Sequence, residues 1–215
     1  MNHSKIHEIN TSLSTHFVNT LRDERMEASQ FRHMVKNLTL LLADAALNSS
    51  TLQPKIVPTW QGDNSFDYLD ESSIVIVTVL RAGLPMLEAM MELFPEAQAG
   101  FLAIKRDETT HRSKLYYDRL PECRGKQIIL VDPMIATGGS LIDAMEILKD
   151  HGASKIISLN IIGSPEGLKC VTDAYEELDI YIAQIDEGLN DDKYIIPGLG
   201  DAGDREYNTL LPFIL

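Results

Sequence analysis

The chain has 215 residues, a mass of 24.0 kDa and a formal net charge of −13 at pH 7. This length predicts one domain, residues 1–215, and the acidic charge disfavours nucleic acid as a partner. No apolar run reaches the roughly 18 residues that a membrane span needs, and the N-terminal segment lacks the apolar core of a signal peptide. We therefore expect a cytoplasmic protein with no membrane partner. Cys123 and Cys170 lack the spacing of zinc ligands or of a disulfide framework.

Two helices are predicted near the N-terminus. Residues 27–46 place apolar side chains at three- and four-residue spacing, which indicates an amphipathic helix with Ser29 as its cap. Residues 12–22 give a weaker helical pattern. We expect residues 1–50 to form a helical arm over one end of a sheet, and arms of this kind often carry the contacts of a homodimer or a larger homo-oligomer.

The segment from Thr51 to Asp70 contains prolines and short alternating pieces, which favours a hairpin or an edge strand. We expect Trp60 and Phe66 to fill a small core within it. No catalytic residue is predicted in this hairpin.

A buried strand is predicted from Ser73 to Leu80, followed by Arg81 and a helix over residues 86–93. Ligands of open α/β sheets sit at the carboxyl ends of strands. Arg81 is therefore a candidate for binding a diphosphate, because its planar fork pairs with two phosphate oxygens. The alternative is a solvated arginine at a strand end.

Residues 99–104 form a third predicted strand, and the polar stretch after it lacks periodicity. Residues 105–120 are predicted to be a hood or lid loop, since long loops beside an active site often cover it.

The most informative stretch is ILVDPMIATGGS, residues 129–140. An apolar strand ends at Asp132, and helical spacing begins at Leu141, so residues 134–140 form a short loop between strand and helix. Such a loop can bind a phosphate through backbone N–H groups, hydroxyls and the helix dipole, while Asp132 accepts hydrogen bonds from sugar hydroxyls. The alternative is a strand, a glycine turn and a capped helix without a ligand.

Two more strands are predicted, at residues 155–162 and 179–185, with a helix opened by Ser164 and Pro165 between them. Strands alternating with helices predict an α/β fold with a doubly wound, mostly parallel sheet flanked by helices.

A glycine-rich segment, YIIPGLGDAGD, spans residues 194–204. It contains GxGxxG at Gly198, Gly200 and Gly203, but it lacks the following helix and the later acid of a dinucleotide site, so that interpretation is rejected. A loop of this kind can instead present backbone groups to a flat ligand, or it can be a plain C-terminal turn.

Four motifs, LRAGLPM, KRDE, VDPMIATGGS and YIIPGLGDAGD, resemble those of the uracil phosphoribosyltransferases, a branch of the type I phosphoribosyltransferases, and they occur in the same order. The resemblance covers Leu21 to the C-terminus. The Asp-Pro pair at Asp132 and Pro133 resembles this branch, whereas most other branches carry two adjacent acids.

The resemblance implies transfer of a phosphoribosyl group from 5-phospho-α-D-ribose 1-diphosphate to uracil, giving UMP. It assigns catalytic roles to Asp132, Arg106 and Asp201, with Asp201 as a weak candidate for a general base. Residues implied in binding phosphoribosyl diphosphate are Arg81, Arg106, Asp132, Pro133, Met134, Ile135, Ala136, Thr137, Gly138, Gly139, Ser140 and Asp201. Those implied in binding uracil are Ile195, Gly200, Asp201 and Ala202.

The family also implies Mg²⁺ as a cofactor, held by diphosphate and ribose without a direct side-chain ligand, and GTP as a candidate allosteric activator. The predicted hood departs from the family pattern at Arg112, Ser113 and Lys114. This departure leaves an alternative open, a catalytically weak regulatory protein that binds uracil or phosphoribosyl diphosphate. Transfer to a purine base is disfavoured by the single acid at Asp132.

Overall fold

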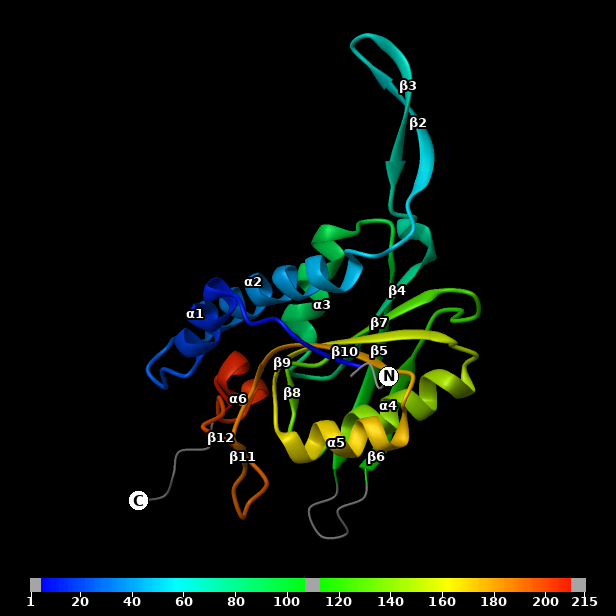
Figure 1. The fold of residues 1–215 in the computed structure, drawn as a ribbon. Helices are drawn as coiled ribbons and strands as arrows, with labels where there is room; N and C mark the ends of the chain where they lie inside the picture. The colour runs from blue at the N-terminus through cyan, green and yellow to red at the C-terminus, as the bar shows by residue number, and fades with distance from the viewer. Residues whose placement is uncertain (1–4, 107–112, 210–215) are drawn as a thin grey trace.

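A twisted, mostly parallel sheet forms the centre of the protein (Figure 1). The structure is a computed structural model that describes residues 5–106 and 113–209. The strand order is β1-β10-β9-β7-β4-β5-β6, with β8 paired to β9, and the β5–β6 pair is antiparallel while the others are parallel. The strands are β1 (Ile6–Glu8), β4 (Ile74–Val79), β5 (Gln98–Arg106), β6 (Ser113–Arg119), β7 (Gln127–Val131), β8 (Met134–Ile135), β9 (Lys155–Gly163) and β10 (Asp179–Ile185). The predicted doubly wound α/β fold is confirmed.

The chain winds outward from the middle of this sheet in two directions. From β4 it moves to β5 through α3 (Leu84–Leu93), and from β7 it moves to β9 and β10 through α4 (Gly139–Asp150) and α5 (Pro165–Ala174). The strand order therefore reverses between β4 and β7, and the carboxyl ends of these two strands flank the crevice where open α/β sheets bind ligands.

Helices cover both faces of the sheet (Figure 1). α1 (Ser12–Leu21), α2 (Ala28–Leu47) and α3 share one buried cluster with the sheet, and α4 and α5 share the other. Phe31, Val35, Leu38 and Leu42 of α2 are fully buried, as its apolar spacing predicts.

One detail of the N-terminal prediction is wrong. α2 begins after Glu27, which makes no side-chain cap, and Ser29 lies inside the first turn. The helical arm packs on one face of the sheet toward its β1–β10–β9 end, where α2 contacts β9 and β10 and α1 contacts β10. The long apolar stripe of α2 is buried against this surface.

The predicted hairpin is present, but it has no core. β2 (Gln53–Thr59) and β3 (Gly62–Tyr68) pair antiparallel as a separate two-stranded sheet that extends from the body. Trp60 is 91% exposed and Phe66 is 48% exposed, so the expectation that they fill a small core is wrong. A two-stranded ribbon with no packed layer against it has no interior to fill.

Several short elements were not predicted. The hood region of residues 105–120 includes β6, which continues β5 as an antiparallel ribbon. β1 adds an edge strand beside β10, and β11 (Gly188–Leu189) pairs with β12 (Ile195–Ile196). A helix, α6 (Ala202–Tyr207), begins within the glycine-rich segment, contrary to the sequence prediction. Within residues 5–106 and 113–209, no helix is long and apolar enough to cross a membrane.

Candidate active site

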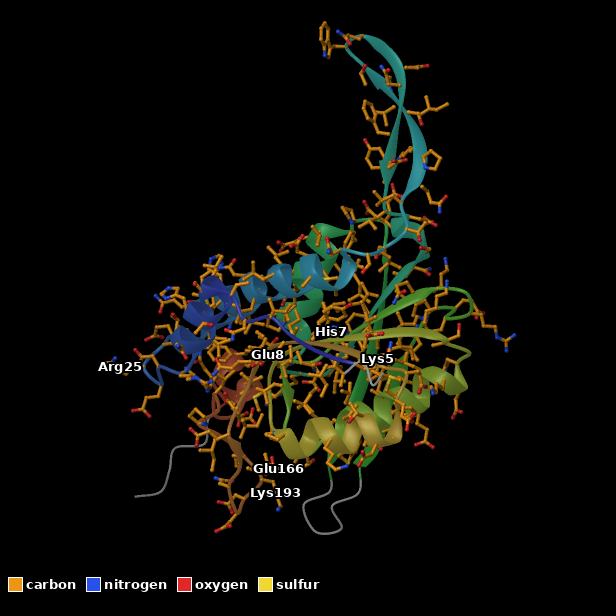
Figure 2. All side chains as sticks on the ribbon, in the orientation of Figure 1. Lys5, His7, Glu8, Arg25, Glu166 and Lys193 are labelled. Atoms are coloured by element: carbon orange, nitrogen blue, oxygen red, sulfur yellow. The ribbon has the colours of Figure 1, made fainter. Side chains whose placement is uncertain are left out.

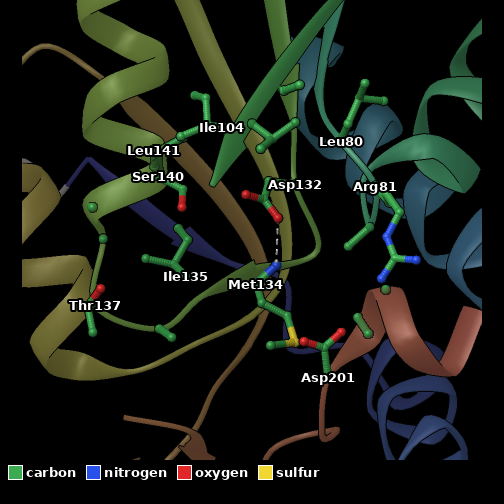
Figure 3. A pocket seen from close by; sticks show the side chains of 18 of the residues that line it. Leu80, Arg81, Ile104, Asp132, Met134, Ile135, Thr137, Ser140, Leu141 and Asp201 are labelled. Atoms are coloured by element: carbon green, nitrogen blue, oxygen red, sulfur yellow. Dashed lines mark hydrogen bonds between the residues drawn. The ribbon is translucent and has the colours of Figure 1, made fainter. Parts of the chain in front are cut away.

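A cavity of about 660 Å³ opens at the carboxyl ends of β4, β5 and β7 (Figure 3). The predicted phosphate loop, the strand-end acid and arginine, and the start of α6 meet there. The lining residues that the sequence predicted are Arg81, Asp132, Met134, Ile135, Ala136, Thr137, Gly138, Gly139, Ser140, Asp201 and Ala202. One cavity thus joins three of the four sequence motifs.

Asp132 lies where β7 ends, at the back of the cavity. Burial raises the pKa of its carboxyl to about 7, opposed by the main-chain N–H of Met134, which lies 3.4 Å from Oδ1. The main chain is held by the buried Asn160, whose amide donates to the Asp132 carbonyl at 2.7 Å, and Asn160 in turn accepts from Ser158. The main chain at Asp132 is therefore held in place, and burial favours the uncharged form of its carboxyl.

The loop of residues 134–140, here called the phosphate loop, is fixed by β9 and α5. β8 pairs with Ile162 and Gly163 at the end of β9. Ser164, the N-cap of α5, donates to the carbonyl of Ala136 at 2.6 Å and accepts from the N–H of Gly167 at 2.9 Å. Ser164, the cap of α5, thus holds the phosphate loop that precedes α4.

Gly138 gives this loop its turn. It has φ of +82° and is the N-cap of α4. A Cβ at this position would lie 2.7 Å from the carbonyl oxygen of Gly167 and 2.9 Å from Val171. Only glycine fits both the backbone conformation and the space, and the turn directs the positive end of α4 toward the cavity.

Arg81 follows β4, and its guanidinium extends toward α6 and away from Asp132 (Figure 3). It donates to Asp204 at 2.8 Å and to Thr209 at 3.3 Å. Its side chain remains 52% exposed. The arginine is thus paired with the helix that follows the glycine-rich segment, in a position accessible to an anion in the cavity.

The segment of residues 194–204, here called the base loop, is anchored by a remote ion pair. Arg22, after α1, donates to both carboxylate oxygens of Asp186 at 3.0 and 2.6 Å and to the carbonyl of Gly198 at 2.8 Å. Asp186 also accepts from the Gly198 N–H at 3.0 Å, and its side chain is fully buried. Both backbone polar groups of Gly198 are therefore held by one buried pair.

A second arginine ties α6 to the N-terminal helices. Arg205 donates to the carbonyls of Leu21, Leu199 and Asp23 at 2.5, 2.8 and 2.6 Å, and it lies over the ring of Phe31. Asp201 caps α6 by accepting from the N–H of Asp204 at 2.8 Å. The turn between α1 and α2, here called the α1–α2 corner (residues 22–27), thus contacts the chain on both sides of the base loop.

Some predicted site residues lie away from the cavity lining. The Pro133 carbonyl accepts from Ile161 and Ile162 in β9, Ile195 is buried in β12, and Gly200 turns the base loop with φ of +74°. The side chain of Arg106 lies outside the described part of the structure, as do Arg112 and the side chains of Ser113 and Lys114. Their predicted roles remain predictions.

Other lining residues were missed: Val79, Leu80, Ala82, Ala103, Ile104, Tyr116, Leu141 and Gly203. Ala82 belongs to the LRAGLPM motif and Tyr116 to the predicted hood, so both lay within regions already singled out. Nothing in the local sequence points to Arg22, Asp186 or Arg205, whose importance depends on contacts across the fold.

Together these groups suit an anionic sugar. The phosphate loop and the α4 terminus favour a phosphate, a carboxyl sits beside the space where a sugar would extend, and an arginine stands at the opposite side. Among the described residues, no group of three or more His, Cys, Asp or Glu side chains is arranged to hold a metal ion.

A family model described as uracil phosphoribosyltransferase matches residues 8–209. The uracil phosphoribosyltransferase of Aquifex aeolicus is 45% identical over 200 residues, which is 93% of this chain and 96% of that protein. A solved structure of a protein from Aquifex aeolicus, 45% identical, has a TM-score of 0.91 and covers 94% of this chain and 97% of its own. A purine phosphoribosyltransferase from Pyrococcus horikoshii, 16% identical with a TM-score of 0.50 over 72% of this chain and 84% of its own, shares the fold alone.

Proposed function

The chain belongs to the uracil phosphoribosyltransferase family, and we propose that it transfers the phosphoribosyl group of 5-phospho-α-D-ribose 1-diphosphate to uracil, giving UMP and diphosphate. It is a pentosyltransferase of pyrimidine salvage. The observation that carries this proposal is the meeting, in one cavity, of the phosphate loop, Asp132, Arg81 and the start of α6.

The phosphate loop binds the 5-phosphate through its backbone N–H groups, its hydroxyls and the positive end of α4. Arg81 and Arg106 bind the diphosphate, and Arg81 exchanges Asp204 for this ligand. Support comes from the exposure of Arg81 and from its position across the cavity from the phosphate loop. These contacts hold both ends of the substrate, so that much of the rate comes from positioning.

Asp132 holds the ribose hydroxyls. Loss of diphosphate leaves positive charge on the ribose ring, and a carboxylate beside the ring stabilises that charge. Burial holds the pKa of Asp132 near 7 in the free protein, and a nearby positive charge favours the ionised form of the carboxyl.

Uracil is read by backbone groups of the base loop at Ile195, Gly200 and Ala202. Its edge offers an acceptor, a donor and an acceptor, which N–H and C=O groups can pair without a side chain. As the bond from N1 to the ribose forms, N1 loses a proton. Asp201, at the cavity edge, is the proposed acceptor of that proton.

Mg²⁺ is the proposed cofactor, held by diphosphate and ribose oxygens. The cavity fits this group, because it offers the carboxylates of Asp132 and Asp201 on either side, and Mg²⁺ often keeps its waters while bound through substrate phosphates near one or two carboxylates. When bound, the ion neutralises charge on the leaving diphosphate. Asp201 would accept hydrogen bonds from water bound to the ion.

The direct test is to incubate the protein with labelled uracil, phosphoribosyl diphosphate and Mg²⁺ and to measure UMP, with GTP added to a parallel sample. We expect UMP that requires Mg²⁺ and that hypoxanthine does not replace. The GTP sample tests the proposed activation. Uracil binding without formation of UMP in either sample would contradict the proposed enzymatic activity and favour the alternative of a catalytically weak regulatory protein.

Asp132→Asn is the companion variant. The amide keeps the shape of the side chain but removes its charge, so we expect kcat to fall by about 10²- to 10³-fold, as when a group aimed at developing charge is removed. Circular dichroism and melting would check the fold. Wild-type kcat in a folded Asp132→Asn protein would remove Asp132 from the mechanism.

A homodimer or larger homo-oligomer is proposed, with a second copy of the chain covering the β2–β3 hairpin. Its side chains stand clear of the rest of the chain (Figure 2), and Trp60 and Ile56 are 91% and 72% exposed. Sedimentation should give at least the mass of a dimer, and Trp60→Ser should weaken the association without lowering the melting temperature of the dissociated chain. A wild-type monomer at micromolar concentration would contradict this proposal.

The cytoplasm is the proposed location. Support comes from Cys123 and Cys170, which are both free thiols, since reducing compartments keep cysteines in this form.

A further inference from the structure

Glu206 is a buried acid that the proposed mechanism does not use. It lies on α6 and is 0% exposed, and neither carboxylate oxygen has a hydrogen-bond partner within the described residues. Glu206 follows Ala202 and Gly203 by four and three residues, so it lies on the helix face that lines the cavity. A buried acid without a partner is unusual enough to require an explanation.

The charges around Glu206 belong to the candidate active site. Burial raises the pKa of its carboxyl to about 9, and the charge of Asp132 is the next largest cause. Asp201 raises this pKa as well, while Arg32 from α2 and Arg81 after β4 lower it. Arg32 donates to the main-chain carbonyl of Glu206, and Arg81 donates to the carboxylate of Asp204. Neither of these two hydrogen bonds reaches the Glu206 carboxyl.

Glu206 and Asp132 therefore titrate as a pair of buried carboxyls. The Asp132 pKa lies near 7 and the Glu206 pKa near 9, so between these values the pair carries about one negative charge. Of the two carboxyls, that of Asp132 has the lower pKa and lines the cavity. Ionisation of Glu206 would place a third negative charge beside Asp132 and Asp201, next to a cavity that takes an anionic substrate.

We propose that Glu206 is a positioning residue for substrate binding, and that its uncharged carboxyl, buried on the same face of α6 as Ala202 and Gly203, leaves Asp132 as the buried carboxylate facing phosphoribosyl diphosphate. This inference rests on the proposed function, because that function supplies the anionic substrate. Glu206 touches no substrate and acts through the charge of Asp132. Loss of its proton weakens binding of phosphoribosyl diphosphate at alkaline pH.

Calorimetry of phosphoribosyl diphosphate with Mg²⁺ tests this inference. Uracil is omitted because it ionises in the same alkaline range. Between pH 8 and 10 the wild-type Kd should rise about tenfold more than that of Glu206→Gln, as follows when only the form protonated at a pKa near 9 binds. Glu206→Gln, which has the shape of the neutral acid, should match the wild-type Kd at pH 7.5.

Glu176→Gln is the matched control. Glu176 is exposed and does not line the cavity, so the variant should follow the wild-type curve. Equal pH dependence of Kd in wild type and Glu206→Gln would overturn the inference. Absence of phosphoribosyl diphosphate binding at every pH would overturn the proposed function and the inference with it, which distinguishes the two failures.

Thermal unfolding gives a second readout that needs no ligand. An acid whose pKa is higher in the folded state than in the unfolded state stabilises the fold below its unfolded pKa, and that contribution is lost as the pH rises through the folded pKa. The melting temperature of the wild type should therefore fall between about pH 5 and 9 relative to that of Glu206→Gln. Parallel curves would show that Glu206 is ionised in the folded protein and would overturn the inference.

Discussion

The phosphate loop and the base loop meet at one cavity but are held in different ways. Residues 134–140 are supported by β9 and by the cap of α5, within about thirty residues of sequence. Residues 194–204 are supported by Arg22, which lies 164 residues from its partner Asp186. The first loop is part of a repeating strand, loop and helix unit, whereas the second takes its shape from the N-terminal helices.

Phosphate binding and base binding therefore depend on different parts of the fold. A phosphate needs N–H groups and a helix terminus, which a local turn supplies. A flat base that is read by backbone groups needs a loop of fixed shape, and a glycine-rich loop has no rigidity of its own. The buried Arg22–Asp186 pair supplies that rigidity by holding both polar groups of Gly198.

Arg22→Met should have the largest effect on the base loop. It leaves the buried Asp186 carboxylate without its partner, which should lower the free energy of unfolding by about 3 kcal/mol. We expect KM for uracil to rise by at least about tenfold, corresponding to about 1.4 kcal/mol, while KM for phosphoribosyl diphosphate changes little. Urea unfolding and steady-state kinetics would measure both effects.

Arg25→Met is the control for this variant. Arg25 lies on the same α1–α2 turn, is 84% exposed on its side chain (Figure 2) and pairs with Asp23 at the surface. It should leave stability and both KM values as in the wild type. A rise in KM for uracil in both variants would show that the turn matters in general and that the buried pair has no special role.

Gly138→Ala should have a smaller effect on stability, and its effect on binding should be directed at the phosphate loop. A Cβ there meets the Gly167 carbonyl in a left-handed backbone, a strain of about 2 kcal/mol. We expect KM for phosphoribosyl diphosphate to rise about thirtyfold if that strain is relieved by displacing the loop. KM for uracil should stay within about twofold of its wild-type value.

Gly125→Ala separates backbone strain from the clash. Gly125 also has a positive φ, of +72°, but a Cβ there meets nothing within 4 Å. This variant should lower stability by about 1 kcal/mol and leave KM unchanged. If Gly125→Ala raised KM for phosphoribosyl diphosphate as strongly as Gly138→Ala, the proposal that contacts near Gly138 shape the phosphate loop would be wrong.

The same difference explains what the sequence could predict. The strand ending at Asp132 and the loop before Leu141 were predictable because apolar runs, glycines and helical spacing lie next to one another. The doubly wound, mostly parallel sheet followed from alternating strands and helices. These are patterns whose physical cause lies within about fifteen residues.

The remaining features depend on distant contacts. The Arg22–Asp186 pair, the burial of Glu206 and the pairing of Arg81 with Asp204 have no local pattern. The three-residue β1 is a strand only because β10 offers an edge. α6 follows a glycine-rich loop that does not favour a helix, and Asp201 caps it while Arg205 fixes it to the α1–α2 corner.

The most direct test of this account is to measure KM for uracil and for phosphoribosyl diphosphate in Arg22→Met and Gly138→Ala under one set of conditions. The account predicts that Arg22→Met raises mainly KM for uracil and that Gly138→Ala raises mainly KM for phosphoribosyl diphosphate. Equal increases of both KM values in both variants would contradict it, because the two loops would then act as one unit without separate supports.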